Sequence, residues 1–135
     1  MDKASQMIKI KRVHHIAIIC SNYQLSKKFY LEVLGFNLDS EVYREARQSF
    51  KADLSINGTY VIELFSFPET PPRPSRPEAA GLRHIAFEVE DIESVVKTLQ
   101  GKAIFVETIR IDEFTGKKFT FIADPDGLPI EFYES

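Results

Sequence analysis

Apolar and polar positions follow a strand-like pattern in several short stretches of the chain and a helical pattern in two others. The segment Arg12–Cys20 is rich in Val and Ile and predicts a strand. Apolar residues recur at helical spacing between Asn22 and Gly35, and these two residues are typical of an N-cap and of a C-terminal stop. Three further extended stretches follow, at residues 36–43, 49–56 and 60–67.

The second half of the chain repeats this order of one strand, one helix and three strands. Its predicted elements are a strand at 82–89, a helix at 92–100 and strands at 104–111, 118–122 and 129–133. Residues 68–81 between the halves hold five of the seven prolines, and proline lacks the amide donor that a sheet interior needs. We therefore expect one domain over residues 1–135, in which an extended connector joins a first module at 12–67 to a second at 82–135.

Four ionisable residues occupy equivalent positions in the two halves. His84 follows His15 by 69 positions, and Glu131 follows Glu63 by 68. Side chains alternate across a strand, so the immediate neighbours of these residues face the opposite way. Those neighbours are all apolar and predict the face that the helices cover: Ile16, Ile18, Ile62, Leu64, Ile85, Phe87, Ile130 and Phe132.

The same four residues predict a metal site on the other face of the strands. A buried carboxylate without a partner costs several kcal/mol or becomes protonated, whereas a divalent cation compensates its charge. Two imidazoles and two carboxylates can bind zinc, nickel, cobalt, manganese or iron(II), and this set of ligands does not discriminate among these metals. A single His on a strand is usually a structural residue, but four residues at duplicated positions favour one ion held by His15, Glu63, His84 and Glu131.

Composition narrows the class of protein. The chain has 135 residues, 44% of them hydrophobic, and a formal charge of −3 with no basic block, which argues against nucleic-acid binding. Cys20 is the single cysteine, so no intramolecular disulfide forms and a cytoplasmic location is expected. The N-terminal residues lack the apolar core of a signal peptide, and no apolar stretch is long enough to span a membrane.

Five sequence motifs resemble the vicinal oxygen chelate superfamily, which includes glyoxalase I, bleomycin-resistance proteins and extradiol dioxygenases. They are HHIAI at 14–18, SKKFYLEVLGF at 26–36, VIELF at 61–65, LRHIAFEV at 82–89 and ADPDGLPIEFYE at 123–134. The resemblance covers nearly the whole chain, and within the superfamily it is greatest to small bacterial proteins of the YaeR type.

This resemblance implies an α+β fold of two paired βαβββ modules, which form a curved mixed sheet with the helices on its outer face. It implies the metal ligands His15, Glu63, His84 and Glu131, and a metal-dependent lyase or isomerase of the glyoxalase I type. In such enzymes the metal stabilises an enediolate of a small vicinal-oxygen substrate, for example a hemithioacetal. Glu131 is the first candidate for the residue that transfers the proton, and Glu63 is the second. A homodimer is expected, with the modules paired either within one chain or between two.

Two other functions stay open at this stage. An iron(II)-dependent extradiol-type dioxygenase uses two His and one carboxylate, and Glu63 would occupy a position that such a site keeps open. A non-enzymatic binding or resistance protein usually lacks the complete ligand set. Ile19 and Phe67 stand where bacterial glyoxalase I typically has an Arg and an Asn, which leaves the substrate open. Other cations that could meet substrate carboxylates are Arg44, Arg47, Arg110 and Lys118.

Overall fold

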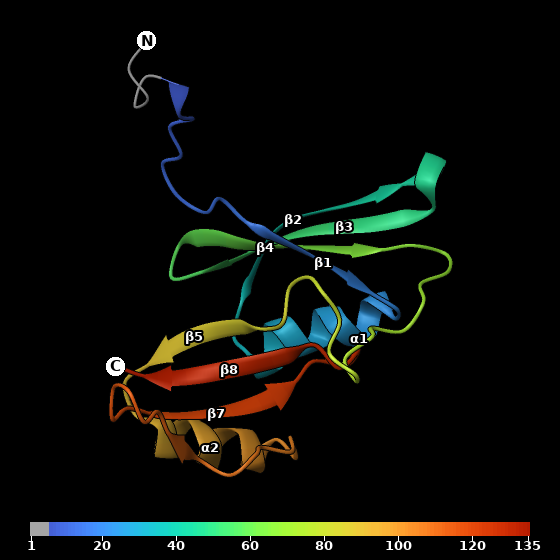
Figure 1. Ribbon diagram of the computed structural model, residues 1–135. Helices are drawn as coiled ribbons and strands as arrows, with labels where there is room; N and C mark the ends of the chain where they lie inside the picture. Colours follow the sequence, from blue (N-terminus) through green and yellow to red (C-terminus); the bar gives the residue numbers. More distant parts are fainter. Residues whose placement is uncertain (1–5) are drawn as a thin grey trace.

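The computed structural model describes residues 6–135 and contains the two expected modules (Figure 1). The first module consists of β1 (Ile16–Cys20), α1 (Tyr23–Lys28), the π-helical turn η2 (Phe29–Val33), β2 (Asn37–Arg44), the 3₁₀ turn η3 (Glu45–Arg47), β3 (Ser49–Ile56) and β4 (Thr59–Ser66). The second consists of β5 (Ile85–Val89), α2 (Ile92–Gly101), β6 (Arg110–Ile111), β7 (Lys118–Ala123) and β8 (Pro129–Glu134). The fold is α+β, as the sequence predicted.

Each module forms its own four-stranded mixed sheet, and the two sheets have the same topology. The strand orders are β1-β4-β3-β2 and β5-β8-β7-β6. The first strand of each module is parallel to the last, and the other pairs are antiparallel. The registers also correspond, because Ala17 pairs with Glu63 and Ala86 pairs with Glu131. The duplication seen in the sequence is therefore a duplication of structure.

The core lies on the sheet faces that the alternation of residues predicted. Ile62, Leu64 and Ile130 are fully buried, and Ile18, Ile85 and Phe132 are nearly so. The burial of each such side chain stabilises the fold by about 1.5–3 kcal/mol. The opposite faces carry the four ionisable residues, whose side chains are 14% to 36% exposed.

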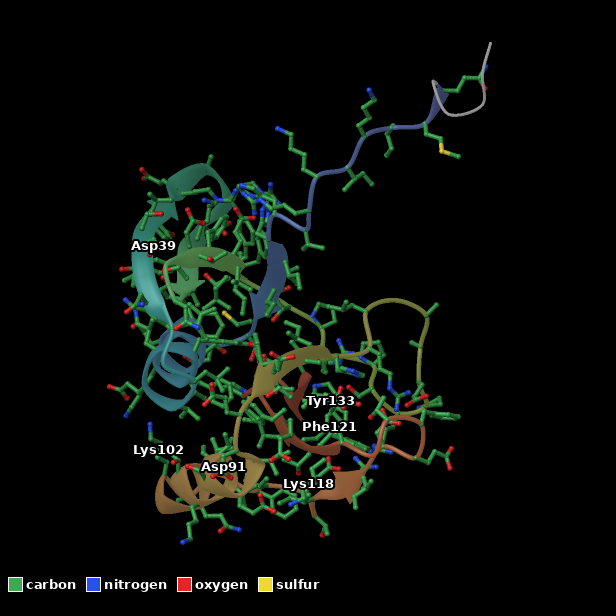
Figure 2. The ribbon with its side chains drawn as sticks, turned by 90° about the vertical axis from the view of Figure 1, so that its left-hand side faces the viewer. Asp39, Asp91, Lys102, Lys118, Phe121 and Tyr133 are labelled. Atoms are coloured by element: carbon green, nitrogen blue, oxygen red, sulfur yellow. The ribbon has the colours of Figure 1, made fainter. Side chains whose placement is uncertain are left out.

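The two modules contact each other through the first helix and the loops beside it. In Figure 1, α1 lies on the side of the first sheet that faces the second module, and α2 lies on the far side of the second sheet. The ring of Phe36 packs against that of Phe87 with centroids 5.7 Å apart. Lys102, just after α2, points toward the first helix (Figure 2) and donates a 2.6 Å hydrogen bond to the carbonyl of Glu32. One continuous core therefore spans both modules.

Local signals explain most of the element boundaries. Asn22 caps α1 by accepting a 3.1 Å hydrogen bond from the amide of Leu25, and Gly35 ends the helical segment with a φ of 79°. Asn57 and Gly58 have φ values of 50° and 77°, the conformation of a tight hairpin turn between β3 and β4.

The predicted strand at 104–111 is wrong for most of its length. Only Arg110–Ile111 pairs with β7 as a strand. Among the preceding residues, Glu107 forms isolated hydrogen bonds with β7, one of them from its amide to the carbonyl of Phe121. Isolated bonds do not build a ladder, so apolar composition alone overstated the strand. No helix among the described residues is both long and apolar enough to cross a membrane.

Candidate metal centre

The second module brings His84 and Glu131 together. His84 lies directly before β5 rather than within it, and Glu131 lies on β8, the neighbouring parallel strand. The Nε2 atom of His84 is 3.1 Å from Oε1 of Glu131, and both side chains are largely buried. The ring of His84 also meets that of Phe121 edge-on, with centroids 5.2 Å apart. Phe121 lies near Tyr133 on the second sheet (Figure 2).

The first module repeats this pair with His15 and Glu63. His15 precedes β1 as His84 precedes β5, so both histidines sit one residue before the strand in which the sequence placed them. The Nε2 atom of His15 is 3.7 Å from Oε1 of Glu63, with His15 the more exposed of the two. The ring of Tyr60 stacks on that of His15 at a centroid distance of 5.3 Å and restricts its orientation.

The spacing of both pairs fits two ligands of one divalent cation. Ligand atoms about 2.0–2.2 Å from a zinc-like ion are roughly 2.8–3.6 Å apart when their bonds to the ion meet at octahedral or tetrahedral angles. The observed separations of 3.1 Å and 3.7 Å lie at or near that range. Each pair also presents an imidazole nitrogen and a carboxylate oxygen, the donor atoms that such ions prefer.

The single chain does not gather all four residues at one point. Among residues 6–135, three His, Cys, Asp or Glu ligand atoms lie mutually within 4.8 Å only at Asp91, Glu93 and Glu134. This acidic group serves the fold, because Glu134 accepts from the amide of Ile92 at the start of α2 and Glu93 pairs with Lys118 at 2.7 Å. His15 with Glu63, and His84 with Glu131, therefore form two separate pairs, and each pair is a candidate half-site.

The two glutamates have different surroundings. Oε2 of Glu63 lies 3.4 Å from the Lys51 ammonium and accepts a 3.3 Å hydrogen bond from the Tyr60 hydroxyl. Asp53 adds to this cluster, because it lies 3.0 Å from Lys51 and also accepts from Tyr60. Burial, with the charges of Asp53 and Glu63, raises the pKa of Tyr60, so its phenol stays a proton donor. In the described part of the chain, Glu131 has no side-chain partner besides His84.

Comparison with known proteins identifies the family. Residues 12–132 match the Glyoxalase/Bleomycin resistance protein/Dioxygenase superfamily. The chain belongs to this superfamily. It is 62% identical to YaeR of Escherichia coli (strain K12) over 128 residues, which cover 95% of this chain and 99% of YaeR. It is 59% identical to YwkD of Bacillus subtilis (strain 168), with coverage of 93% and 98%.

Solved structures of superfamily members share the fold. A glyoxalase family protein from Enterococcus faecalis is 49% identical and superposes with a TM-score of 0.86, covering 92% of this chain and 98% of that one. The prediction of superfamily membership is thereby confirmed. Similarity to YaeR also agrees with the expected subgroup.

Three residues that sequence analysis did not select lie next to the candidate ligands. His14 was left out, yet its Nδ1 lies 2.8 Å from Nδ1 of His15. A hydrogen bond to the distal ring nitrogen orients an imidazole that binds a metal through its other nitrogen. Lys51 and Tyr60 were also missed, because nothing in the local pattern marks a residue on a neighbouring strand. The sequence signal that could have identified His14 is its position directly before His15.

The cations that the sequence proposed for substrate carboxylates have different positions. Lys118 is engaged by Glu93. The guanidinium of Arg44 lies over the ring of Phe65 at 4.9 Å, and that of Arg110 lies over Phe119 at 5.0 Å. Arg47 lies over Phe67 at 5.2 Å. The three arginines therefore stack on aromatic rings.

Proposed function

We propose that this chain is a metal-dependent lyase or isomerase of the glyoxalase I type, acting on a small substrate with adjacent oxygen atoms. The observation that carries the proposal is the repeated His–Glu pair. Each module places a histidine Nε2 beside a glutamate Oε1, at 3.7 Å in the first and 3.1 Å in the second. A cation held between two such pairs would have two nitrogen and two oxygen ligands, with positions left for water or substrate.

A second copy of the chain would complete the site in this proposal. His15 and Glu63 of one copy would face His84 and Glu131 of the other in a symmetric dimer with two sites. The exposure of apolar residues near the pairs in sequence supports this arrangement, because Ile19, four residues after His15, is 56% exposed and Leu82, two residues before His84, is 54% exposed. Large apolar side chains on an open face favour contact with another protein surface.

The different surroundings of the two glutamates suggest different roles. A divalent cation offsets negative charge that develops on a substrate oxygen. Glu63 is held by Lys51 and Tyr60, which suits a fixed ligand. Glu131 lacks such partners among the described residues and can move toward the substrate. It would take a proton from the carbon beside the carbonyl and return it to the neighbouring carbon, so that it ends the cycle unchanged.

Metal content and turnover of the purified protein test the proposal. Elemental analysis is expected to find about one divalent ion per chain, because a symmetric dimer has two sites. Isomerisation of the methylglyoxal–glutathione hemithioacetal is then assayed with added nickel, cobalt or zinc. Glu131→Gln is expected to lower turnover by roughly 100-fold or more while much of the bound metal is retained. Glu63→Gln should lower metal content more than Glu131→Gln does.

The matched control is Glu90→Gln, which removes one exposed carboxylate from the loop before α2. It should leave metal content and turnover unchanged. Absence of metal under every loading condition, or turnover that is the same in Glu131→Gln and in the wild type, would contradict the proposal. Metal together with oxygen-dependent cleavage of a catechol would replace it with a dioxygenase.

A further inference from the structure

A cavity of about 290 Å³ lies beside the second half-site, under the proline-rich connector. His84 and Phe121 form part of its wall, and the connector supplies much of the rest. A volume of this size is at the lower end of the range for small-molecule sites, so it suits a small ligand or one end of a larger ligand.

Four arginines line this cavity, namely Arg73, Arg76, Arg83 and Arg110. Two carboxylates, Glu78 and Glu107, lie in the same wall. The cavity therefore has an excess of two positive charges, which is notable in a chain whose formal charge is −3. The low dielectric constant of the cavity walls strengthens the electric field of these charges, and this field attracts anions.

Hydrogen bonding shows which arginines carry the excess charge. Arg83 forms an ion pair with Glu78, and Arg110 lies 3.3 Å from Glu107 in an exposed pair. Arg73 donates to two backbone carbonyls, at 2.8 Å and 2.9 Å, and has no carboxylate partner among the described residues. Arg76 has no hydrogen-bond or ion-pair partner in residues 6–135. The charges of Arg73 and Arg76 are therefore uncompensated.

The cavity and the half-site share residues. His84 lines the cavity and lies 3.1 Å from Glu131, while Phe121 packs edge-on against the His84 ring. The Arg110 guanidinium lies over Phe121 at 5.5 Å, so the aromatic ring separates it from the imidazole. A substrate molecule bound at His84 and Glu131 that extends into the cavity would contact the arginines there.

We propose that this cavity binds an anionic group of the substrate, a carboxylate or a phosphate, whose reacting oxygen atoms lie at the His84–Glu131 half-site. Arg76 is the principal contact and Arg110 the second. Arg73 positions the connector through its bonds to the carbonyls of Leu82 and Arg83. The inference rests on the function proposed above, and it narrows the substrate to acids and phosphate esters. Arginine suits this role because its planar fork binds two oxygens of such a group at once.

Titration of the metal-loaded protein with two probes tests the inference. Inorganic phosphate and succinate are added separately at constant ionic strength, and the arginine Nε–H signals are followed by NMR. Signals of Arg76 and Arg110 are expected to shift with at least one probe. Arg76→Gln should weaken that binding about tenfold, the loss expected for one charge-assisted hydrogen bond. A preference for phosphate or succinate identifies which anion the cavity takes.

Arg110→Gln is the second variant, and Lys97→Gln on the exposed surface of α2 is the control for the loss of one charge. Lys97→Gln should bind both probes as the wild type does. Affinity that is equal in the wild type, Arg76→Gln and Arg110→Gln would overturn the inference, because the probes would then bind elsewhere, at the metal for example. Metal content is measured on the same samples. A protein without metal that still binds anions through Arg76 would support the anion site and contradict the proposed enzyme.

Discussion

The hydroxyl of Tyr30 donates a 2.8 Å hydrogen bond to Oδ2 of Asp124, and this bond joins the first module to the final turn of the second. Tyr30 is fully buried, and Asp124 is 5% exposed. The other carboxylate oxygen of Asp124 accepts from the amides of Asp126 and Leu128, at 2.9 Å each, and so shapes the turn before β8. Burial, with the charge of Asp124, raises the pKa of the Tyr30 phenol, which keeps it a donor at every ordinary pH.

Removal of this hydroxyl should destabilise the whole chain. Tyr30→Phe leaves a buried carboxylate without one of its three donors, and an unsatisfied buried polar group costs about 1–3 kcal/mol. Denaturant unfolding followed by circular dichroism should show a loss of that size. Tyr43→Phe is the control, because Tyr43 is 53% exposed. An equal effect of the two substitutions would mean that the bond between the modules contributes nothing measurable.

The hydroxyl of Tyr60 should matter for metal affinity. Tyr60→Phe removes the hydrogen bond to Glu63 but keeps the ring that stacks on His15. Loss of an outer-shell hydrogen bond typically lowers metal affinity about 10- to 100-fold. Competition with a fluorescent chelator measures this change, again with Tyr43→Phe as control. Unchanged affinity would show that Lys51 alone is sufficient to orient Glu63.

Much of the fold follows from local sequence patterns. The alternation around Glu63 and Glu131 predicted which strand faces would be buried, and the structure confirms it at Ile62 and Ile130. Asn22 and Gly35 marked the ends of the first helical segment because caps depend on neighbours in sequence. No comparable signal in the sequence marks the point within that segment where α1 ends and η2 begins.

The arrangement of the site depends on contacts that are distant in sequence. Duplicated spacing identified His15, Glu63, His84 and Glu131, but it carries no information on how the modules pack, so the sequence left open whether the two pairs meet within one chain or between two. Lys51 reaches Glu63 from a neighbouring strand in the same sheet. The arginine-lined cavity depends on the path of an irregular connector, which residue periodicity does not describe.

Cys20 should be unreactive in the folded protein. Its side chain is 1% exposed, and its thiol donates to the carbonyl of Phe65 at 3.2 Å. Burial raises the pKa of this thiol to about 11. At pH 8 roughly one molecule in a thousand would then be a thiolate. A disulfide reagent should react slowly with native protein at pH 8, faster as the pH approaches 11, and rapidly after unfolding in guanidinium. Fast reaction of the native state at pH 8 would contradict the buried position.

Metal removal should separate the chains if a second copy completes the site. In the proposed dimer each ion links His15 and Glu63 of one chain to His84 and Glu131 of the other, so metal binding stabilises the dimer by mass action. Sedimentation velocity of metal-loaded protein should show a dimer, and a chelator with dilution should increase the monomer fraction.

His84→Ala should shift the same equilibrium toward monomer even with metal present, because it removes one ligand from each shared site. Mixing two defective chains provides a sharper test. His15→Ala and His84→Ala are each defective in both sites of their own homodimers. A mixed dimer would combine both lost ligands in one site and leave the other site complete. Recovery of metal binding on mixing, up to about half of the sites in each mixed dimer, is therefore expected from a shared centre. If each chain instead formed its own site, mixing would restore nothing, and chelation would leave the dimer intact.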